Sequence, residues 1–470
     1  MVSSWDETTD VLVIGSGFAG LAAAIEAHNK GVSVVVLEKM NAPGGNSIIS
    51  DGGIAAAGTR MQKNRGIKDT PELMYQDMLR AGLSINYPYL VRKVTEKSNE
   101  VVQWSIDYLG IEYLDRLDIF GGHSVPRCLT PVGVSGSTII KRQLEKLNEM
   151  KIKVRTGAFF RTFVRDSDGE ITGVIIREGY SHKGAESGSD KYIGIKRGMV
   201  LATGGFGSDV NFRSTQDPRL TKDIDTTNKP FATAEALKEA MKINAMPVQL
   251  SHIQLGPWGT PDEKGYGAGA RFSDYIVFPY GIVVDPNSGK RIVNELADRK
   301  TISDAILGVG HPCTGIADEK AVETTGWDIK PCLEKGIIKQ FGQLQDLASH
   351  HGISQKELEM AVERYNGYVS DGVDSEFGKQ ILSDAAPIST PPYYGIRTWP
   401  KVHHTMGGVQ INTRAQVMDI NQQPIERLYA AGEVTGGIHG ACRLGSCAVT
   451  ECLVFGRIAG MNASQEPISE

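Results

Sequence analysis

The N-terminal region carries the pattern that most restricts the fold. An apolar run at Asp10–Ile14 leads into the sequence GSGFAG at 15–20, and Leu21–Ala27 then has helical composition. A second apolar run, Val32–Leu37, ends at Glu38. In a strand–turn–helix–strand unit such glycines allow a tight turn, a dinucleotide pyrophosphate binds at the helix N-terminus, and the acid accepts from the ribose hydroxyls. The pattern predicts a Rossmann-like dinucleotide-binding domain.

Further glycine-rich segments favour FAD over a nicotinamide cofactor. Gly44–Ser47 and Asp51–Gly53 follow Glu38 closely, and two more apolar runs end in glycines at Val200–Phe206 and Tyr429–Glu433. Strand ends that recur far apart in the sequence indicate one large cofactor across one sheet edge. No second Gly-x-Gly-x-x-Gly sequence follows. We therefore expect electrons from a separate donor, either a protein such as a cytochrome c or flavin protein, or a soluble carrier.

Composition excludes several classes of protein. The net charge of −5 disfavours nucleic-acid and anionic-membrane partners, and 40% hydrophobic with 22% charged residues is typical of globular proteins. No apolar run reaches the roughly 20 residues that span a bilayer. The segment Met1–Glu7 lacks the basic and apolar regions of a secretory signal. We expect a cytoplasmic protein; a periplasmic origin stays open if a signal was removed.

The segment His403–Gly460 resembles the wall of a ligand site. His404, Glu433 and Arg443 stand among repeated glycines, which let backbone approach a ligand. A turn-rich surface region is the alternative. No cysteine or acid cluster accompanies the paired histidines at 403–404, so no metal site is predicted.

The six cysteines include Cys442 and Cys447, which have the Cys-x4-Cys spacing of some redox disulfides. That motif normally lies near the first dinucleotide site, whereas this pair lies near the C-terminus. Small buried side chains are the default interpretation.

Periodicity divides the rest of the chain. Pro71–Leu109 reads as helical, Gly179–Asp190 as an exposed loop, and the aromatic-rich stretch that follows Arg271–Asp274 and runs to Asp285 as a pair of strands. We expect an α/β protein whose FAD-binding domain comprises residues 1–250 and 403–470, with an α+β capping domain, or clamp, inserted at 251–402.

Motifs along nearly the whole chain resemble one family. They are VLVIGSGFAGLAAAIEA, EKMNAPGGNS, ATGGFG, TTNKPFAT, HHTMGG and LYAAGEVTGGIHGACRLG. In sequence and order they resemble the flavoprotein subunits of the fumarate reductase and succinate dehydrogenase superfamily. The resemblance is strongest to soluble flavocytochrome c-type fumarate reductases and to urocanate- and acrylate-type enoate reductases, here without a haem domain.

The resemblance implies a flavin-dependent enzyme of anaerobic respiration and a role for each matching residue. Arg299 would donate a proton, and His404 and Arg443 would bind a substrate carboxylate. Other substrate-binding positions are Gly53, Thr227, Gly256, Ser273 and Asp274. The FAD-binding positions are Gly15, Gly17, Ala19, Gly20, Glu38, Lys39, Gly45, Asn46, Ser47, Gly52, Gly53, Thr203, Gly204, Glu433, Ser446, Ala448 and Val449. FAD attachment would be non-covalent, because covalent members carry a histidine where this chain has Asn46–Ser47.

Two departures from the family bear on chemistry. The family motif Gln-x-His-Pro, whose histidine binds a second carboxylate, reads Gln254-Leu255-Gly256-Pro257 here. The family's Thr-Glu-x-x-Arg proton relay aligns with Ser273–Val277, so the acid persists as Asp274 and the arginine is lost. Arg271 is near enough in sequence to substitute.

The resemblance implies reduction of the C=C bond of an α,β-unsaturated carboxylate. Arg443 and His404 would stabilise negative charge developing beside the carboxylate, and reduced flavin would supply hydride to the β-carbon. Spacing alone permits an alternative for Arg299, an ion pair with Glu295. A carboxylate without a partner is costly to bury, so fumarate should bind poorly.

Gly256 would leave space for a bulky substituent, so we expect an aryl, heteroaryl or other monocarboxylate enoate. The alternatives are fumarate reductase proper, a ketosteroid dehydrogenase, and a non-catalytic flavin sensor or electron-transfer module.

Overall fold

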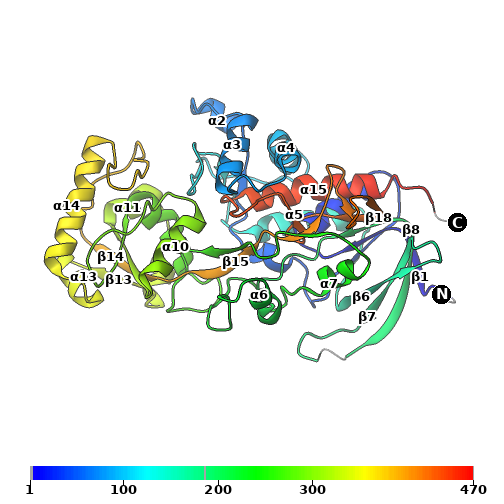
Figure 1. Ribbon diagram of the computed structural model, residues 1–470. Helices are drawn as coiled ribbons and strands as arrows, with labels where there is room; N and C mark the ends of the chain where they lie inside the picture. The colour runs from blue at the N-terminus through cyan, green and yellow to red at the C-terminus, as the bar shows by residue number, and fades with distance from the viewer. Residues whose placement is uncertain (1–3, 185–186, 469–470) are drawn as a thin grey trace.

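The computed structural model describes residues 4–184 and 187–468. Met1–Ser3 of the N-terminal segment and Ala185–Glu186 of the predicted loop at Gly179–Asp190 lie outside them. Two masses of structure are joined by long connections (Figure 1). Both ends of the described chain lie on the mass that contains β1 (Glu7–Ile14) and α15 (Cys447–Ala463) (Figure 1).

The larger mass is built on a mixed sheet. Its strands run in the order β17-β18-β8-β1-β2-β5, and β6 and β7 extend it through β8. β1 pairs in parallel with β2 and β8, and β8 pairs in parallel with β18. The strands are β2 (Val34–Leu37), β5 (Val154–Arg155), β6 (Ala158–Arg165), β7 (Ile171–Glu178), β8 (Ser189–Leu201), β17 (Gln416–Met418) and β18 (Pro424–Ala430).

Helix α1 (Phe18–His28) follows the glycine turn and is buried along almost its whole length. It can pack closely on α15 because α15 presents glycines at the crossing. A Cβ at Gly456 would lie 2.4 Å from Ala19 O, and one at Gly460 would lie 2.1 Å from Ala23 O. This contact fixes the C-terminal helix, and with it the residues just before it, against the dinucleotide motif.

The predicted helix over Pro71–Leu109 is two helices, α3 (Pro71–Ala81) and α4 (Pro88–Asp107). Leu83 and Ser84 adopt positive φ angles of 53° and 56°, which end the helical path. The Asn86 side chain then donates to Ile438 O at 2.9 Å. The break therefore packs against the C-terminal site segment.

The second mass has its own sheet, in the order β11-β12-β14-β13. Its strands are β11 (Ile282–Val284), β12 (Cys313–Asp318), β13 (Ile338–Phe341) and β14 (Tyr393–Thr398), and its helices are α10 (Arg299–Val309), α11 (Glu319–Thr325), α12 (Lys330–Glu334), α13 (Leu344–His351) and α14 (Gln355–Asp371). Its buried side chains form clusters separate from the large core of the first mass. The boundaries at 251 and 402 stay a prediction.

The strand pair expected between Asp274 and Asp285 is wrong in its first half. This stretch is helical, through α8 (Gly269–Phe272), the π-helical segment η2 (Ser273–Val277) and α9 (Phe278–Tyr280), before the single strand β11. Its β-branched and aromatic residues favour strands in general. Here Tyr275 joins the core of the first mass while Ile276 and Val277 join that of the second, so burial on several sides outweighs local propensity.

The connections into and out of the second mass run side by side. β10 (Ile253–Gly256) pairs antiparallel with β15 (Lys401–Thr405), with Gln254 opposite His404 and Gly256 opposite Lys401. The shorter elements are η1 (Gly45–Ile49), α2 (Arg60–Asn64), α5 (Gly136–Glu149), α6 (Val210–Gln216), α7 (Glu235–Lys242), β3 (Ile54–Ala55), β4 (Cys128–Leu129), β9 (Pro247–Val248), β16 (Gly408–Gln410) and β19 (Thr435–Gly436).

Candidate active site

A long cavity follows the carboxyl ends of the parallel strands. Close backbone approach begins at Gly15, where a Cβ would lie 2.2 Å from Ala202 O at the end of β8. The lining includes these predicted positions: Gly15, Gly17, Ala19, Glu38, Lys39, Gly45, Asn46, Ser47, Thr203, Gly204 and Glu433. A neighbouring cavity shares several of them and adds Thr227, His403, His404, Arg443, Ala448 and Val449.

Four predicted cofactor positions line neither cavity. Gly20 lets α1 approach the turn, since its Cβ would lie 2.0 Å from Gly15 O. A Cβ at Gly52 would meet Gly136, and one at Gly53 would lie 2.6 Å from Ser446 Oγ. The remaining position is Ser446, so these residues support the cavity wall through packing.

The residues present fit FAD. Glu38 accepts from the backbone N–H of Ser16 at 3.3 Å and of Met40 at 2.9 Å, which orients a carboxylate with further acceptor capacity. The Asn46 amide bridges to Asn228 at 2.6 Å and to the Lys229 N–H at 2.9 Å. The glycine turn precedes the N-terminus of α1, where a pyrophosphate binds in this kind of unit.

The two adjacent histidines of β15 face different partners. Arg443 Nη2 donates to His403 Nε2 at 2.8 Å. His403 Nδ1 therefore carries the hydrogen and donates to Thr227 Oγ1, also at 2.8 Å. His404 Nδ1 instead lies 3.5 Å from Glu433 Oε1. Successive side chains on a strand point to opposite faces, so the direct contact with Arg443 is made by His403. The expected role of His404 in binding a substrate carboxylate stays a prediction.

Burial sets the protonation states of these groups. Burial, reinforced by Arg443, holds the pKa of both His403 and His404 well below the usual value, so both imidazoles are neutral. Burial also raises the pKa of Glu433. The contact between His404 and Glu433 is therefore not an ion pair. Burial and the nearby Arg299 charge lower the pKa of Arg443 to about 10.

Arg443 is held from its backbone as well. Gln254 of β10 donates from Nε2 to Arg443 O at 2.8 Å. The Arg443 guanidinium keeps a buried Nε with no hydrogen-bond partner among the described residues. A buried N–H of a charged group without a partner is costly, and a bound anion would satisfy it.

Arg299, the first residue of α10, is almost buried and lies 3.4 Å from Asp274 Oδ2. The alternative ion pair with Glu295 is wrong, because Glu295 pairs with Arg291 at 2.8 Å and Lys379 at 3.4 Å. Arg299 Nη1 has no hydrogen-bond partner among the described residues. Burial, opposed by Arg299, raises the pKa of Asp274 to about 6. Asp274 can therefore exchange a proton near neutral pH.

The space expected at Gly256 is filled. A Cβ there would lie 2.7–2.9 Å from the ring of Trp258, whose side chain is fully buried. The Trp258 ring makes an edge contact with the His403 ring at 4.7 Å, and the Arg299 guanidinium lies 5.6 Å from it. The sequence shows the missing histidine at 256 and an aromatic residue nearby at Trp258, but not that this ring takes up the space beside Gly256.

The Asp51 carboxylate accepts hydrogen bonds from three side chains. One of them is Tyr266, whose ring packs against the Trp258 ring with 5.4 Å between the ring centroids. Asp51 accepts from Tyr266 Oη at 3.0 Å, Tyr275 Oη at 3.1 Å and Arg271 Nε at 3.3 Å. Arg271 therefore reaches Asp51, and no contact joins it to Arg299 or Asp274. Its predicted substitution for the lost relay arginine has no direct contact to support it. Ser273 is buried, and its Oγ has no hydrogen-bond partner among the described residues.

An outer cleft of about 890 Å³ shares the lining residues Thr227, Asn228 and Tyr266 with the cavity that contains His403 and Arg443. Lys229, Lys264, Arg271 and Lys335 line it, together with Asp225. Lys264 and Lys335 are exposed. A cleft lined by an excess of cations attracts anions.

The six cysteines are free thiols. Burial raises the pKa of both Cys442 and Cys447 to about 12, so neither thiol is activated. The described residues contain no group of at least three side chains suited to a metal ion, and no described helix is long and apolar enough to cross a membrane.

Comparison with known proteins agrees with this site. Residues 10–449 match the FAD binding domain family. The chain is 42% identical to the acrylate reductase flavoprotein subunit of Shewanella woodyi, covering 97% of this chain and 91% of that protein. It is 35% identical to urocanate reductase of Eggerthella lenta, covering 97% of this chain and 74% of that protein.

Among solved structures, the open conformation of a flavocytochrome c3 fumarate reductase superposes with a TM-score of 0.76 at 33% identity, covering 98% of this chain and 79% of that one. The chain thus has the α/β fold of a flavin-dependent oxidoreductase. It belongs to the FAD-binding flavoprotein family of the fumarate, urocanate and acrylate reductases, and FAD is its cofactor.

Proposed function

We propose that this protein reduces the C=C bond of a small α,β-unsaturated monocarboxylate such as acrylate. The observation that carries the proposal is the pair Arg443 and Arg299, both buried, each with an N–H that lacks a partner, and both close to Trp258 and His403. The likeness to an acrylate reductase subunit supports the same substrate class.

The side chains of the site bind the substrate carboxylate and supply the proton. When bound and reduced by the separate electron donor, FAD would supply a hydride to the β-carbon. Arg443 binds the substrate carboxylate and stabilises negative charge that develops next to it, while His403 orients its guanidinium through the 2.8 Å contact. Arg299 protonates the α-carbon, and Asp274 returns a proton to Arg299. An arginine pKa above about 12 makes it a weak acid, so this step needs a strongly basic carbanion and rapid resupply.

Trp258 sets the size and polarity of the far end of the substrate. A dicarboxylate needs a second charged partner there, and the side chain that fills the space beside Gly256 is the uncharged indole of Trp258. A buried carboxylate without a partner costs several kcal/mol, on the order of 2–5. Fumarate should therefore be a poor substrate, and aryl enoates should be restricted by the same ring.

The test is anaerobic reoxidation of the viologen-reduced enzyme by acrylate, methacrylate, fumarate, cinnamate, urocanate and a 3-ketosteroid. Fast reoxidation by acrylate or methacrylate with slow fumarate turnover is expected. Fumarate as the fastest substrate would overturn the monocarboxylate assignment, and reoxidation by the ketosteroid alone would overturn the enoate class. No reoxidation by any compound would favour a flavin sensor.

The variant Trp258→Ala sharpens the size argument. Removing the indole should raise the rate with cinnamate relative to acrylate, while Trp258→Phe should keep the preference of the wild type. An unchanged ratio in Trp258→Ala would mean that another side chain limits the size of the substrate.

The electron donor is proposed to be a separate protein or carrier, and cytoplasmic location stays a prediction.

A further inference from the structure

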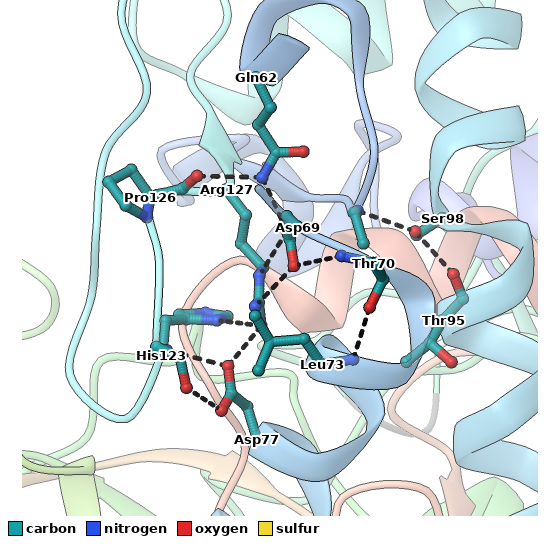
Figure 2. Close-up of polar contacts among 12 residues, drawn as sticks. Gln62, Asp69, Thr70, Leu73, Asp77, Thr95, Ser98, His123, Pro126 and Arg127 are labelled. Atoms are coloured by element: carbon teal, nitrogen blue, oxygen red, sulfur yellow. Dashed lines mark hydrogen bonds and ion pairs between the residues drawn. The ribbon is translucent and has the colours of Figure 1, made fainter. Parts of the chain in front are cut away.

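A buried network of charged side chains, Arg127, Asp69 and Asp77, lies outside the site and contacts the loop 120–124. Arg127 donates from Nε and Nη2 to the two oxygens of Asp69, both at 3.0 Å, and from Nη1 to Asp77 at 2.7 Å (Figure 2). The side chains of Arg127, Asp69 and Asp77 are fully buried. Gln62 also donates to Asp69, at 2.7 Å. None of these groups takes part in the chemistry proposed above.

The network determines which hydrogen bonds His123 can make. Arg127 Nη1 lies 3.3 Å from His123 Nδ1, and a guanidinium can only donate (Figure 2). Nδ1 therefore accepts, and Nε2 carries the hydrogen. His123 Nε2 donates to Gly445 O at 2.9 Å. Burial and Arg127 lower the pKa of His123 to about 3, so this tautomer persists at neutral pH.

The same loop also touches the segment before Arg299. Gly122 N donates to Leu296 O at 3.1 Å. A Cβ at Gly121 would lie only 1.9 Å from Ala297 O. Asp77 anchors the loop from below by accepting from Ser124 N at 2.9 Å. The loop is thus fixed at its base and fills the gap between two backbone segments.

Those two segments carry the arginines of the site. Gly445 lies two residues after Arg443, and Ala297 lies two residues before Arg299. Phe120 completes the contact, since a Cβ at Gly445 would lie 2.6 Å from Phe120 Cβ. Replacing buried ion networks by apolar residues is often neutral for stability, so stability alone is weak grounds for this one.

We infer that loop 120–124, held by the Arg127–Asp69–Asp77 network, is a spacer that sets the separation of Arg443 from Arg299. His123 acts on the Arg443 side and Gly121 on the Arg299 side. Both are positioning residues. The consequence for catalysis rests on the proposed function, whereas the spacer itself is a property of the fold that can be measured without turnover.

The test uses amide hydrogen exchange of the FAD-loaded full chain. His123→Leu removes the donor to Gly445 O and should speed exchange in peptides covering 443–447 and 120–124 by at least about tenfold. His123→Gln can place an N–H near the position of Nε2 and should restore protection. Arg80→Ala is the matched control, because Arg80 contacts the same Asp77 at 3.4 Å from the solvent side. It should leave exchange unchanged.

Gly121→Ala tests the other side and stands alone if His123→Leu fails to fold. Its methyl group must displace the segment at Ala297, so exchange should rise over 296–300 and stay low over 443–447. Unchanged exchange at the targeted segment in either folded variant would overturn the spacer, whatever the wild type does to enoates.

Steady-state kinetics distinguish the His123→Leu and Gly121→Ala variants further. With an enoate that the wild type reduces, His123→Leu should weaken binding of the carboxylate and raise KM. Gly121→Ala should lower kcat, by up to about 100-fold for a displacement near 1 Å. A loss of thermal stability without either kinetic change would overturn the positioning role. Failure of the wild type on every enoate would overturn the proposed function and leave the exchange result standing.

Discussion

His403 and Arg443 meet at 2.8 Å through an imidazole nitrogen that can only accept. Nε2 accepts because a guanidinium can only donate, so Nδ1 carries the hydrogen and donates to Thr227 Oγ1, itself 3.4 Å from Val402 O. A threonine, a histidine and an arginine from three distant segments thus form one directed chain of hydrogen bonds. Its effect is to aim the guanidinium into the cavity, with Nε left for a ligand.

The histidine pair gives the first prediction. His403→Ala should raise KM for the enoate by about tenfold or more, because Arg443 loses the acceptor that orients it. His404→Ala, which removes the neighbour of Glu433, should change the flavin spectrum or FAD retention with a smaller change in KM. Steady-state kinetics and FAD content per chain measure both. Equal kinetic losses in the two variants would mean that His403 and His404 do not have separate roles in substrate binding and FAD binding.

Arg299 gives the second prediction. Arg299→Ala should keep FAD bound and lose at least about 100-fold in kcat, as expected for removal of a proton donor. Lys300→Ala is the control, since Lys300 is exposed, follows directly in the sequence and pairs with Asp304. Single-turnover reoxidation of reduced enzyme measures the step. Full activity in Arg299→Ala would assign the proton to another group.

Much of this site could be predicted from the sequence, because its motifs combine residue type with backbone requirement. The glycines at 15 and 20 pack against Ala202 O and Gly15 O, contacts that no side chain would permit. Arg443 was found because it stands among glycines, whereas Arg299 was assigned through the resemblance to the family, since its spacing alone indicated an ion pair with Glu295. Glu433 lines the predicted cavity for the same reason.

The errors arose where tertiary packing decides. Trp258 fills the space of Gly256 only because the chain turns after β10, and sequence spacing does not show that turn. The contact of His403 with Arg443, which the sequence did not indicate, depends on which face of β15 meets Arg443. The helical residues from Tyr275 to Tyr280 were expected to form a strand, because residues buried between two cores have the apolar composition that is typical of strands.

Asp274 gives a pH prediction. Its pKa of about 6 means that the protonated form, which can resupply Arg299, declines as pH rises through that value. If this resupply limits turnover, kcat should fall above about pH 6, and Asp274→Asn should lower kcat and flatten the profile. The measurement is kcat against pH at saturating enoate. An unchanged profile in Asp274→Asn would exclude this carboxyl from the relay.

Glu451 gives a stability prediction. Its carboxyl is buried in α15 and accepts from Gly432 N at 3.0 Å, and burial raises its pKa to about 8. An unfolded glutamate ionises near 4.5. The native state therefore holds a proton that the unfolded state releases, and stability falls as pH rises from about 4.5 to 8.

Glu451→Gln keeps an oxygen acceptor and has no proton to lose. Relative to the wild type, it should gain stability as pH rises, by about 1 to 4 kcal/mol at pH 8, at 1.36 kcal/mol for each pKa unit. Denaturant unfolding at pH 5 and pH 8 measures the difference. Equal gains at both pH values would show that Glu451 does not titrate in this range.

The outer cleft gives the last prediction. Lys264 and Lys335 are exposed and line the outer cleft, which shares lining residues with the cavity that contains His403 and Arg443. Neither lysine has an ion-pair partner among the described residues. Their charge should raise the local concentration of an anionic substrate. Lys264→Gln with Lys335→Gln should lower kcat/KM by a few fold at low salt and leave kcat unchanged. Because the Debye screening length falls to about 3 Å at 1 M salt, the difference in kcat/KM from the wild type should vanish at that salt concentration. A deficit that persists at high salt would indicate a structural effect of the two lysines rather than attraction of the substrate.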